Sequence, residues 1–268
     1  MERFEALYRQ LFKNICEYSA KDRKNTTLAT HFPVVGKHYT IPVRSMKQEE
    51  QKPRFMIVGR CSNGWDSQPH VAFEYNNEDL YIEEAMGYIA NRATATKWRE
   101  DAKQPKEDLG KPYNINRSAF WRTTQDIWAH LVHPGKPAEE DWYEQIVWTN
   151  LFPVAPKDKG NASNLLCDAQ TDTAIKLFKE TIRYFQPTHV LVESGMNWFS
   201  FTYKEQHHTF HDRIDKSLSN KSIAGRCAFP ETKSRIVIAN RPENINNAEY
   251  CDDVVHAFET MTISGEAI

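Results

Sequence analysis

Four short apolar runs constrain the fold of this chain more than any other feature of its sequence. The runs are 55–59, 145–151, 189–193 and 235–239. Continuous apolar runs of this length are typical of parallel strands that are covered on both faces. Segments with helical periodicity lie between or after the runs, at 81–90, 118–132, 168–185 and 248–261. Strands that alternate with helices predict a parallel sheet with helices on both faces.

These patterns predict one α/β domain over residues 1–268, with three layers in α/β/α order and a central four-stranded parallel sheet. Residues 1 to about 50 are expected to form a helical extension. Residues 203–224 are expected to form a polar insertion between the third and fourth strands. The charged stretch 99–112 predicts a surface loop.

Composition and cysteine content exclude several classes of protein. No run of about eighteen apolar residues occurs, so no membrane-spanning helix is expected. The N-terminal segment lacks the apolar core of a signal peptide, and the five cysteines are scattered, which predicts a cytoplasmic protein with reduced thiols. The net charge of −2 argues against a general nucleic-acid coat protein but allows a local basic groove. We expect a monomer that uses no metal or other cofactor.

Polar groups follow each of the four runs. In chain order they are Arg60-Cys61-Ser62-Asn63-Gly64-Trp65-Asp66, Thr149-Asn150, Glu193-Ser194-Gly195-Met196-Asn197 and Asn240-Arg241. Because the carboxyl ends of parallel strands share one edge of a sheet, these groups are expected to converge on one crevice. Amides with flat donor and acceptor edges, together with a tryptophan that can stack, suit a nucleobase or a similar planar ring.

The order and character of these segments resemble the uracil-DNA glycosylase superfamily. In that family the first strand ends in a Gly-led loop with a polar or acidic residue, the second in an Asn, the third in a Gly turn and the fourth in a His-Pro-type motif. The corresponding segments here are Gly59-Arg60-Cys61-Ser62-Asn63-Gly64, Thr149-Asn150-Leu151, Glu193-Ser194-Gly195 and Asn240-Arg241-Pro242-Glu243. The resemblance covers about 55–258. It implies a uracil-DNA glycosylase-like fold, DNA as the partner, and a role in base excision repair without a cofactor.

The resemblance also implies roles for individual residues. Asn63 or Asp66 would position the attacking water, and Arg241 would stabilise the leaving base. Asn150 would hold the extruded base, which would stack on Trp65. Further contacts to the substrate are assigned to Gly59, Arg60, Cys61, Ser62, Gly64, Gly195, Asn197 and Asn240, and contacts to the DNA backbone to Lys157 and Lys159.

The sequence departs from the family pattern at two positions that matter for catalysis. Cys61, or Asn63 with a shift, stands where many members orient the water with Asp or Asn. Arg241, or Asn240 with a shift, stands where His usually meets the leaving base. A donor against the base and an acceptor near the sugar are still present, so hydrolysis of an N-glycosidic bond stays chemically possible.

Structural roles compete with several of these assignments. Gly59 and Gly64 can serve only the turn after the first strand. Asp66 can cap a helix or turn, and Arg241 can pair with Glu243 instead of facing a ligand.

Aromatic, thiol and imidazole groups also have structural interpretations. Trp65 can anchor the core rather than stack on a base. Cys61 has no activating His nearby in sequence and is expected to be a small packed residue. The histidines of 207–211 are expected in a solvated loop rather than at a metal. Expected in the core because of their helical spacing are Phe120, Trp121, Trp128 and Trp142.

The sequence therefore leaves three hypotheses for the function of the protein. The leading hypothesis is an enzyme that hydrolyses the N-glycosidic bond of an aberrant or modified base in single- or double-stranded DNA. The second is a nucleic-acid or nucleotide binding module that has lost hydrolysis, which the missing Asp and His would explain. The third is a small-molecule hydrolase on the same scaffold.

Overall fold

The main sheet of the protein has six strands in the order β2-β5-β3-β7-β9-β8. The computed structural model describes residues 1–21, 27–42, 53–62, 70–73, 77–103, 115–157, 160–201 and 214–262. The strands are β2 (Val34–Val35), β3 (Phe55–Gly59), β5 (Ile146–Asn150), β7 (His189–Glu193), β8 (Ile223–Phe229) and β9 (Ser234–Ala239). The four inner strands β5, β3, β7 and β9 run parallel. The edge strands β2 and β8 are antiparallel to their neighbours.

The four predicted strands are confirmed, but the prediction of a four-stranded parallel sheet is corrected to a six-stranded mixed sheet. The strand that the sequence pattern missed on one side, β8, alternates between buried and half-buried residues. That alternation is typical of an antiparallel edge strand with one solvated face, and it lacks the continuous apolar run of an inner strand. Residues 223 and 224 therefore belong to β8 rather than to the predicted insertion, and residues 203–213 of that insertion lie outside the described residues.

A second, three-stranded sheet has the order β4-β1-β6 and is antiparallel throughout. Its strands are β1 (Leu28–His31), β4 (His70–Ala72) and β6 (Val154–Pro156). The segment expected as a purely helical extension thus supplies β1 to this sheet and β2 to the main sheet. Short strands of two to four residues carry too little periodicity to be recognised from sequence alone.

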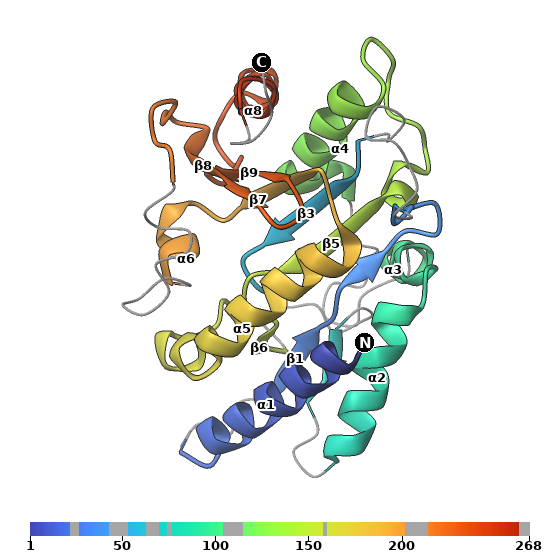
Figure 1. Cartoon of the computed structure of the whole chain (residues 1–268), viewed down its shortest axis with the longest axis vertical. Coiled ribbons are helices and arrows are strands. Elements are labelled where there is room, and N and C mark those ends of the chain that lie inside the picture. Colours follow the sequence, from blue (N-terminus) through green and yellow to red (C-terminus); the bar gives the residue numbers. More distant parts are fainter. Residues whose placement is uncertain are drawn as a thin grey trace.

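Helices cover both faces of the main sheet (Figure 1). They are α1 (Glu2–Ser19), α2 (Glu78–Ala90), α3 (Thr94–Ala102), α4 (Ala119–Val132), α5 (Asn164–Phe185), α6 (Met196–Phe201) and α8 (Asn247–Glu259). The four predicted helices correspond to α2, α4, α5 and α8. The loop prediction for 99–112 is wrong at its start, because Arg99 to Ala102 end α3, and residues 104–112 lie outside the described residues.

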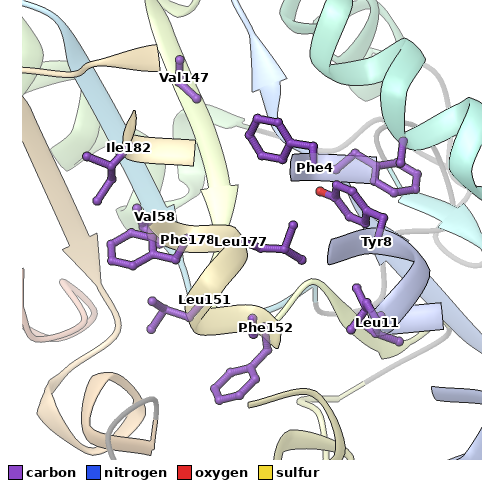
Figure 2. Packing of buried hydrophobic residues seen from close by; sticks show 14 of the residues in the cluster. Phe4, Tyr8, Leu11, Val58, Val147, Leu151, Phe152, Leu177, Phe178 and Ile182 are labelled. Atoms are coloured by element: carbon purple, nitrogen blue, oxygen red, sulfur yellow. The ribbon is translucent and has the colours of Figure 1, made fainter. Parts of the chain in front are cut away.

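Alternate side chains of the inner strands pack into two different layers. Met56 and Val58 of β3 pack with α1, α2 and α5, whereas Phe55 and Ile57 pack with α3, α4 and α8. This is the period of two expected for a strand that is buried on both faces. Figure 2 shows the first layer, in which side chains of α1 and α5 lie against those of β3 and β5. In the described ranges, no helix combines the length and the apolar character that crossing a membrane requires.

The helix that approaches the carboxyl ends of the strands, α4, starts where the sequence predicts. The hydroxyl oxygen of Ser118 accepts a hydrogen bond from the backbone N–H of Trp121 at 3.4 Å. This cap satisfies one of the free N–H groups of the first turn. It also fixes the start of the helix beside the ends of the inner strands, so the first turn of α4 takes part in the site described next.

Candidate functional site

A pocket of about 260 Å³ lies at the carboxyl ends of the inner strands. All four parallel strands contribute to it, as expected for an open α/β sheet. It is lined by Gly59, Arg60, Cys61, Ser62, Ser118, Phe120, Trp121, Trp148, Asn150, Asn161, Glu193, Arg241 and Glu243. The residues from the four strand ends, far apart in sequence, thus meet in one place.

The structure brings together some of the predicted site residues and separates others. Those that line the pocket are Gly59, Arg60, Cys61, Ser62, Asn150 and Arg241. Those that do not line it are Gly195, Asn197, Asn240 and Lys157. Outside the described residues lie Asn63, Gly64, Trp65, Asp66 and Lys159. The roles that the sequence assigns to these five stay predictions.

Gly195 and Asn240 have structural tasks instead. Gly195 adopts a φ of 74°, which favours glycine, and its N–H donates to the carbonyl of Ala239 at 2.8 Å. The side chain of Asn240 donates to the carbonyl of Lys221 at 3.0 Å and so ties the end of β9 to the turn before β8. Both residues hold the ends of β7 and β9 in place without facing the pocket.

Asn150 is a buried amide that is fixed by its surroundings. In the orientation that gives both amide groups a partner, Oδ1 accepts from the N–H of Ser62 at 3.3 Å and Nδ2 donates to the carbonyl of Thr149 at 3.3 Å. One lone pair and one N–H then remain for a ligand. Gly59 makes room for this amide, because a Cβ at Gly59 would lie 2.4 Å from the Asn150 side chain. The glycine is needed here for close approach, and its φ is not positive.

Glu193 is one of the pocket residues that the site prediction missed, although it was noted as the end of the third strand. Its side chain is 2% exposed. Oε1 lies 3.1 Å from the hydroxyl of Thr123 and 3.3 Å from that of Tyr250, while Oε2 has no partner among the described residues. Burial raises the pKa of this carboxyl well above 4.5, and hydrogen bonding to the two hydroxyls opposes the shift only in part. Burial therefore favours the neutral form of this carboxyl.

Two arginines give the pocket its charge. Arg60 donates through Nε to the carbonyl of Ser194 at 3.1 Å and lies 5.3 Å from the centroid of the Trp198 ring. Burial, and then the neighbouring charge of Arg241, lower its pKa. Arg241 forms an ion pair with Glu243, with Nε 2.9 Å from Oε2, which is one of the two roles left open for it. The pocket thus combines two guanidinium groups and the Glu243 carboxylate with the Glu193 carboxyl, whose charged form is disfavoured by burial.

Three aromatic residues form part of the wall, and two of them were expected only in the core. Trp121 and Trp148 are buried with ring centroids 4.9 Å apart, and Phe120 is half-buried beside Trp121. Phe120 also lies 4.0 Å from the position that a Cβ of Gly59 would take. Helical spacing identified the core role of α4 correctly. It missed that the first turn faces the strand ends, since Ser118 as the N-cap was the only local signal of where the helix begins.

Cys61 is unsuited to act as a nucleophile. Its thiol faces Oδ1 of Asn161 with 3.7 Å between sulfur and oxygen. Burial raises the pKa of the thiol, and a hydrogen bond with the backbone of Ala162 and the nearby arginines offset this only partly, which disfavours the reactive thiolate. Within the part of the chain that the structure describes, no three His, Cys, Asp or Glu side chains gather in a way that could hold a metal ion. The histidines of 207–211 lie outside that part.

The arrangement supplies a flat amide, a buried carboxyl group and two guanidinium groups around a cavity with aromatic walls. Such a site can read the polar edge of a planar ring and support negative charge that develops on it. Comparison with known proteins adds no functional assignment: no family model matches the chain, and no curated protein has significant similarity to it.

Proposed function

We propose that the pocket binds a base extruded from DNA and that the protein hydrolyses the N-glycosidic bond of that base. One observation carries the proposal, namely that the ends of four parallel strands deliver Asn150, Glu193 and Arg241 to one cavity with aromatic walls. Enzymes that act on a base take it out of the helix, read its edge by hydrogen bonds and stack it against aromatic or apolar groups. The same placement supports a uracil-DNA glycosylase-like arrangement of the strands.

The size of the cavity supports a single ring. Pockets for drug-sized ligands typically measure roughly 300–1,000 Å³. At about 260 Å³, this pocket suits one planar ring system better than a whole nucleotide. A base that enters from outside would leave its sugar at the mouth of the pocket.

The charge of the pocket supports cleavage with the base as leaving group. In glycosidic hydrolysis the sugar becomes oxocarbenium-like while the departing base gains electrons. Arg60 and Arg241 place positive charge at the pocket, where a guanidinium can donate to an anionic base oxygen. Asn63 or Asp66 remains the predicted holder of the attacking water.

A non-catalytic binding module is the second candidate, and the ion pair of Arg241 favours it. A guanidinium already bound to Glu243 is a weaker donor to a leaving base, because part of its charge is neutralised. Such a module would still hold a base in the pocket and would still bind the DNA backbone.

An abasic-site assay tests the proposal. The protein is incubated with oligonucleotides that carry uracil, hypoxanthine, xanthine or a modified cytosine, and abasic sites are then cleaved with alkali. We expect strand breaks with at least one base, strongly reduced in Asn150→Ala and in Arg241→Ala. The exposed Asn164→Ala and Arg3→Ala serve as matched controls that keep wild-type activity.

Strand breaks that persist unchanged in both pocket variants would contradict the assignment of the site. A second outcome is that no base gives strand breaks while the protein binds DNA with an affinity that falls steeply as the salt concentration rises. That outcome would favour the binding module. If the protein neither produces strand breaks nor binds DNA, the small-molecule hydrolase is the remaining hypothesis.

A further inference from the structure

Of the two arginines that line the pocket, only one has a carboxylate partner among the described residues. Arg241 is bound by Glu243, which accepts from Nε at 2.9 Å and also from Nη2. Arg60 is half-buried and forms no ion pair in the part of the chain that the structure describes. Glu193 also lines the pocket, but burial favours its neutral form. Because charges that are withdrawn from water are usually paired, Arg60 suits an anionic group of a ligand.

The guanidinium of Arg60 is held in place while its outer N–H groups stay available. Its Nε donates to the carbonyl of Ser194 at 3.1 Å, and the group lies 5.3 Å from the centroid of the Trp198 ring. These contacts fix the side chain between the end of β7 and α6. The N–H groups on Nη1 and Nη2 have no acceptor among the described residues. A guanidinium in this state can bind an oxyanion through two parallel hydrogen bonds.

The ion pair between Arg241 and Glu243 is exposed to solvent. The two side chains are 43% and 40% exposed, whereas Asn150 is 7% exposed, so the ion pair marks the outer side of the pocket. Exposed ion pairs contribute little net stability, because water competes for both partners. Another anion can therefore displace Glu243 from Arg241 at small cost, and this exchange would free Nε and Nη2.

The charges of Arg60 and Arg241 act on each other across the pocket. Burial lowers the pKa of Arg60, and the charge of Arg241 lowers it further, while Glu243 acts in the opposite direction. Two like charges that are held near each other repel, and an anion that contacts both relieves the repulsion. A phosphate suits this position, because its oxygens can accept hydrogen bonds from two guanidinium groups at once.

We propose that Arg60 and Arg241 bind a phosphate of the nucleotide whose base enters the pocket, and that Glu243 is a competing anion which this phosphate displaces. The inference rests on the proposed function, because it takes the ligand to be a nucleotide. A cavity of about 260 Å³ holds the base, and the phosphate stays at the exposed side. Nη1 of Arg241, to which Glu243 does not bind, remains available to an oxygen of the base.

Nucleosides and their phosphates test the inference without any need for hydrolysis. Saturation-transfer NMR titrations of the full chain, at about 0.15 M salt, would compare deoxyuridine and deoxyinosine with their 5′- and 3′-monophosphates. We expect at least one monophosphate to bind more tightly than its nucleoside by on the order of tenfold, the effect of charge-assisted hydrogen bonds. A short single-stranded oligonucleotide with the same base tests a phosphate within a DNA chain.

Two substitutions of Glu by Gln separate a competing anion from a change in net charge. Glu243→Gln preserves shape and removes the competing charge. It should strengthen binding of the monophosphate roughly two- to fivefold, which corresponds to the strength of an exposed ion pair, and leave binding of the nucleoside unchanged. The exposed Glu140→Gln changes the net charge equally but outside the pocket, so it should strengthen neither. Arg60→Met, which keeps an apolar side chain beside Trp198, should remove most of the preference for the monophosphate.

Each remaining outcome decides the inference. Equal affinity for the nucleosides and their monophosphates, equal strengthening by Glu243→Gln and Glu140→Gln, or a preference that survives in Arg60→Met would overturn it. If abasic sites still form in such a case, the proposed function stands while this inference fails. If no nucleoside, nucleotide or oligonucleotide binds and no abasic site forms, both fail.

The oligonucleotide identifies the source of the phosphate. A gain in Glu243→Gln that extends to the oligonucleotide supports a phosphate of the DNA chain. A gain confined to the mononucleotide supports the phosphate site for free nucleotides and argues against DNA as the substrate.

Discussion

Replacing Glu193 by Gln should change how the stability of the protein depends on pH. Burial raises the pKa of Glu193 in the folded state well above 4.5, whereas in the unfolded chain the carboxyl is exposed to water. Above about pH 4.5 the unfolded wild type releases this proton while the folded protein keeps it. Gln has no proton to release, so the variant does not share this part of the pH dependence.

The sign and size of the effect follow from linkage. A group whose pKa is raised by folding contributes stability that is present below the unfolded pKa and is lost as pH rises through the folded pKa. The free energy of unfolding of the wild type, relative to Glu193→Gln, should therefore fall by about 1.4 kcal/mol per pH unit. The fall begins near pH 4.5 and levels off above the folded pKa, which the break in slope would locate.

Urea denaturation at several pH values between 4.5 and 9 measures the difference. Other titrating groups are common to both proteins and cancel in the comparison. The exposed Glu140→Gln is a matched control and should follow the wild-type pH dependence. A stability difference between wild type and Glu193→Gln that stays constant over this range would refute the reasoning, because it would mean that Glu193 has the same proton affinity folded and unfolded.

Two further outcomes follow from the pocket. Gly59→Ala should destabilise the protein by roughly 1–3 kcal/mol in chemical denaturation, because its Cβ would displace the Asn150 amide and its hydrogen bonds. Gly87→Ala is the control, because Gly87 lies in α2 with open space around the new Cβ, and it should instead stabilise the protein by about 0.5–1 kcal/mol. Equal effects of the two substitutions would argue against the close approach of Gly59 to the Asn150 side chain. Iodoacetamide should alkylate Cys61 more slowly in the folded than in the urea-unfolded chain, as followed by peptide mass spectrometry; faster labelling of the folded protein would reveal an activated thiolate after all.

The composition of the pocket was only partly predictable. Asn150 and Arg241 were accessible from sequence because each follows a recognisable apolar run. Glu193 also ends such a run, but the sequence does not show that Thr123 and Tyr250, distant along the chain, contact one of its oxygens. Nor does it show that the other oxygen is buried without a hydrogen-bond partner among the described residues. Phe120 and Trp121 were assigned to the core because helical spacing shows which face of α4 is apolar. It does not show that the first turn of this helix lies beside the strand ends and lines the pocket.

By itself, the sequence determined the class of the fold and the edge of the sheet at which the polar groups gather. Continuous apolar runs can be satisfied only by burial on both faces, so β3, β5, β7 and β9 had to be inner strands covered by helices. Only the tertiary structure showed that β2 and β8 are the edge strands of the sheet. The sequence of β2 is too short, and that of β8 too regularly alternating, to be recognised as a strand of this sheet until the neighbouring strand is known. It also decided the chemistry of the pocket, because the burial that raises the pKa of Glu193 and the hydroxyl groups that contact this carboxyl come from residues that meet only after folding.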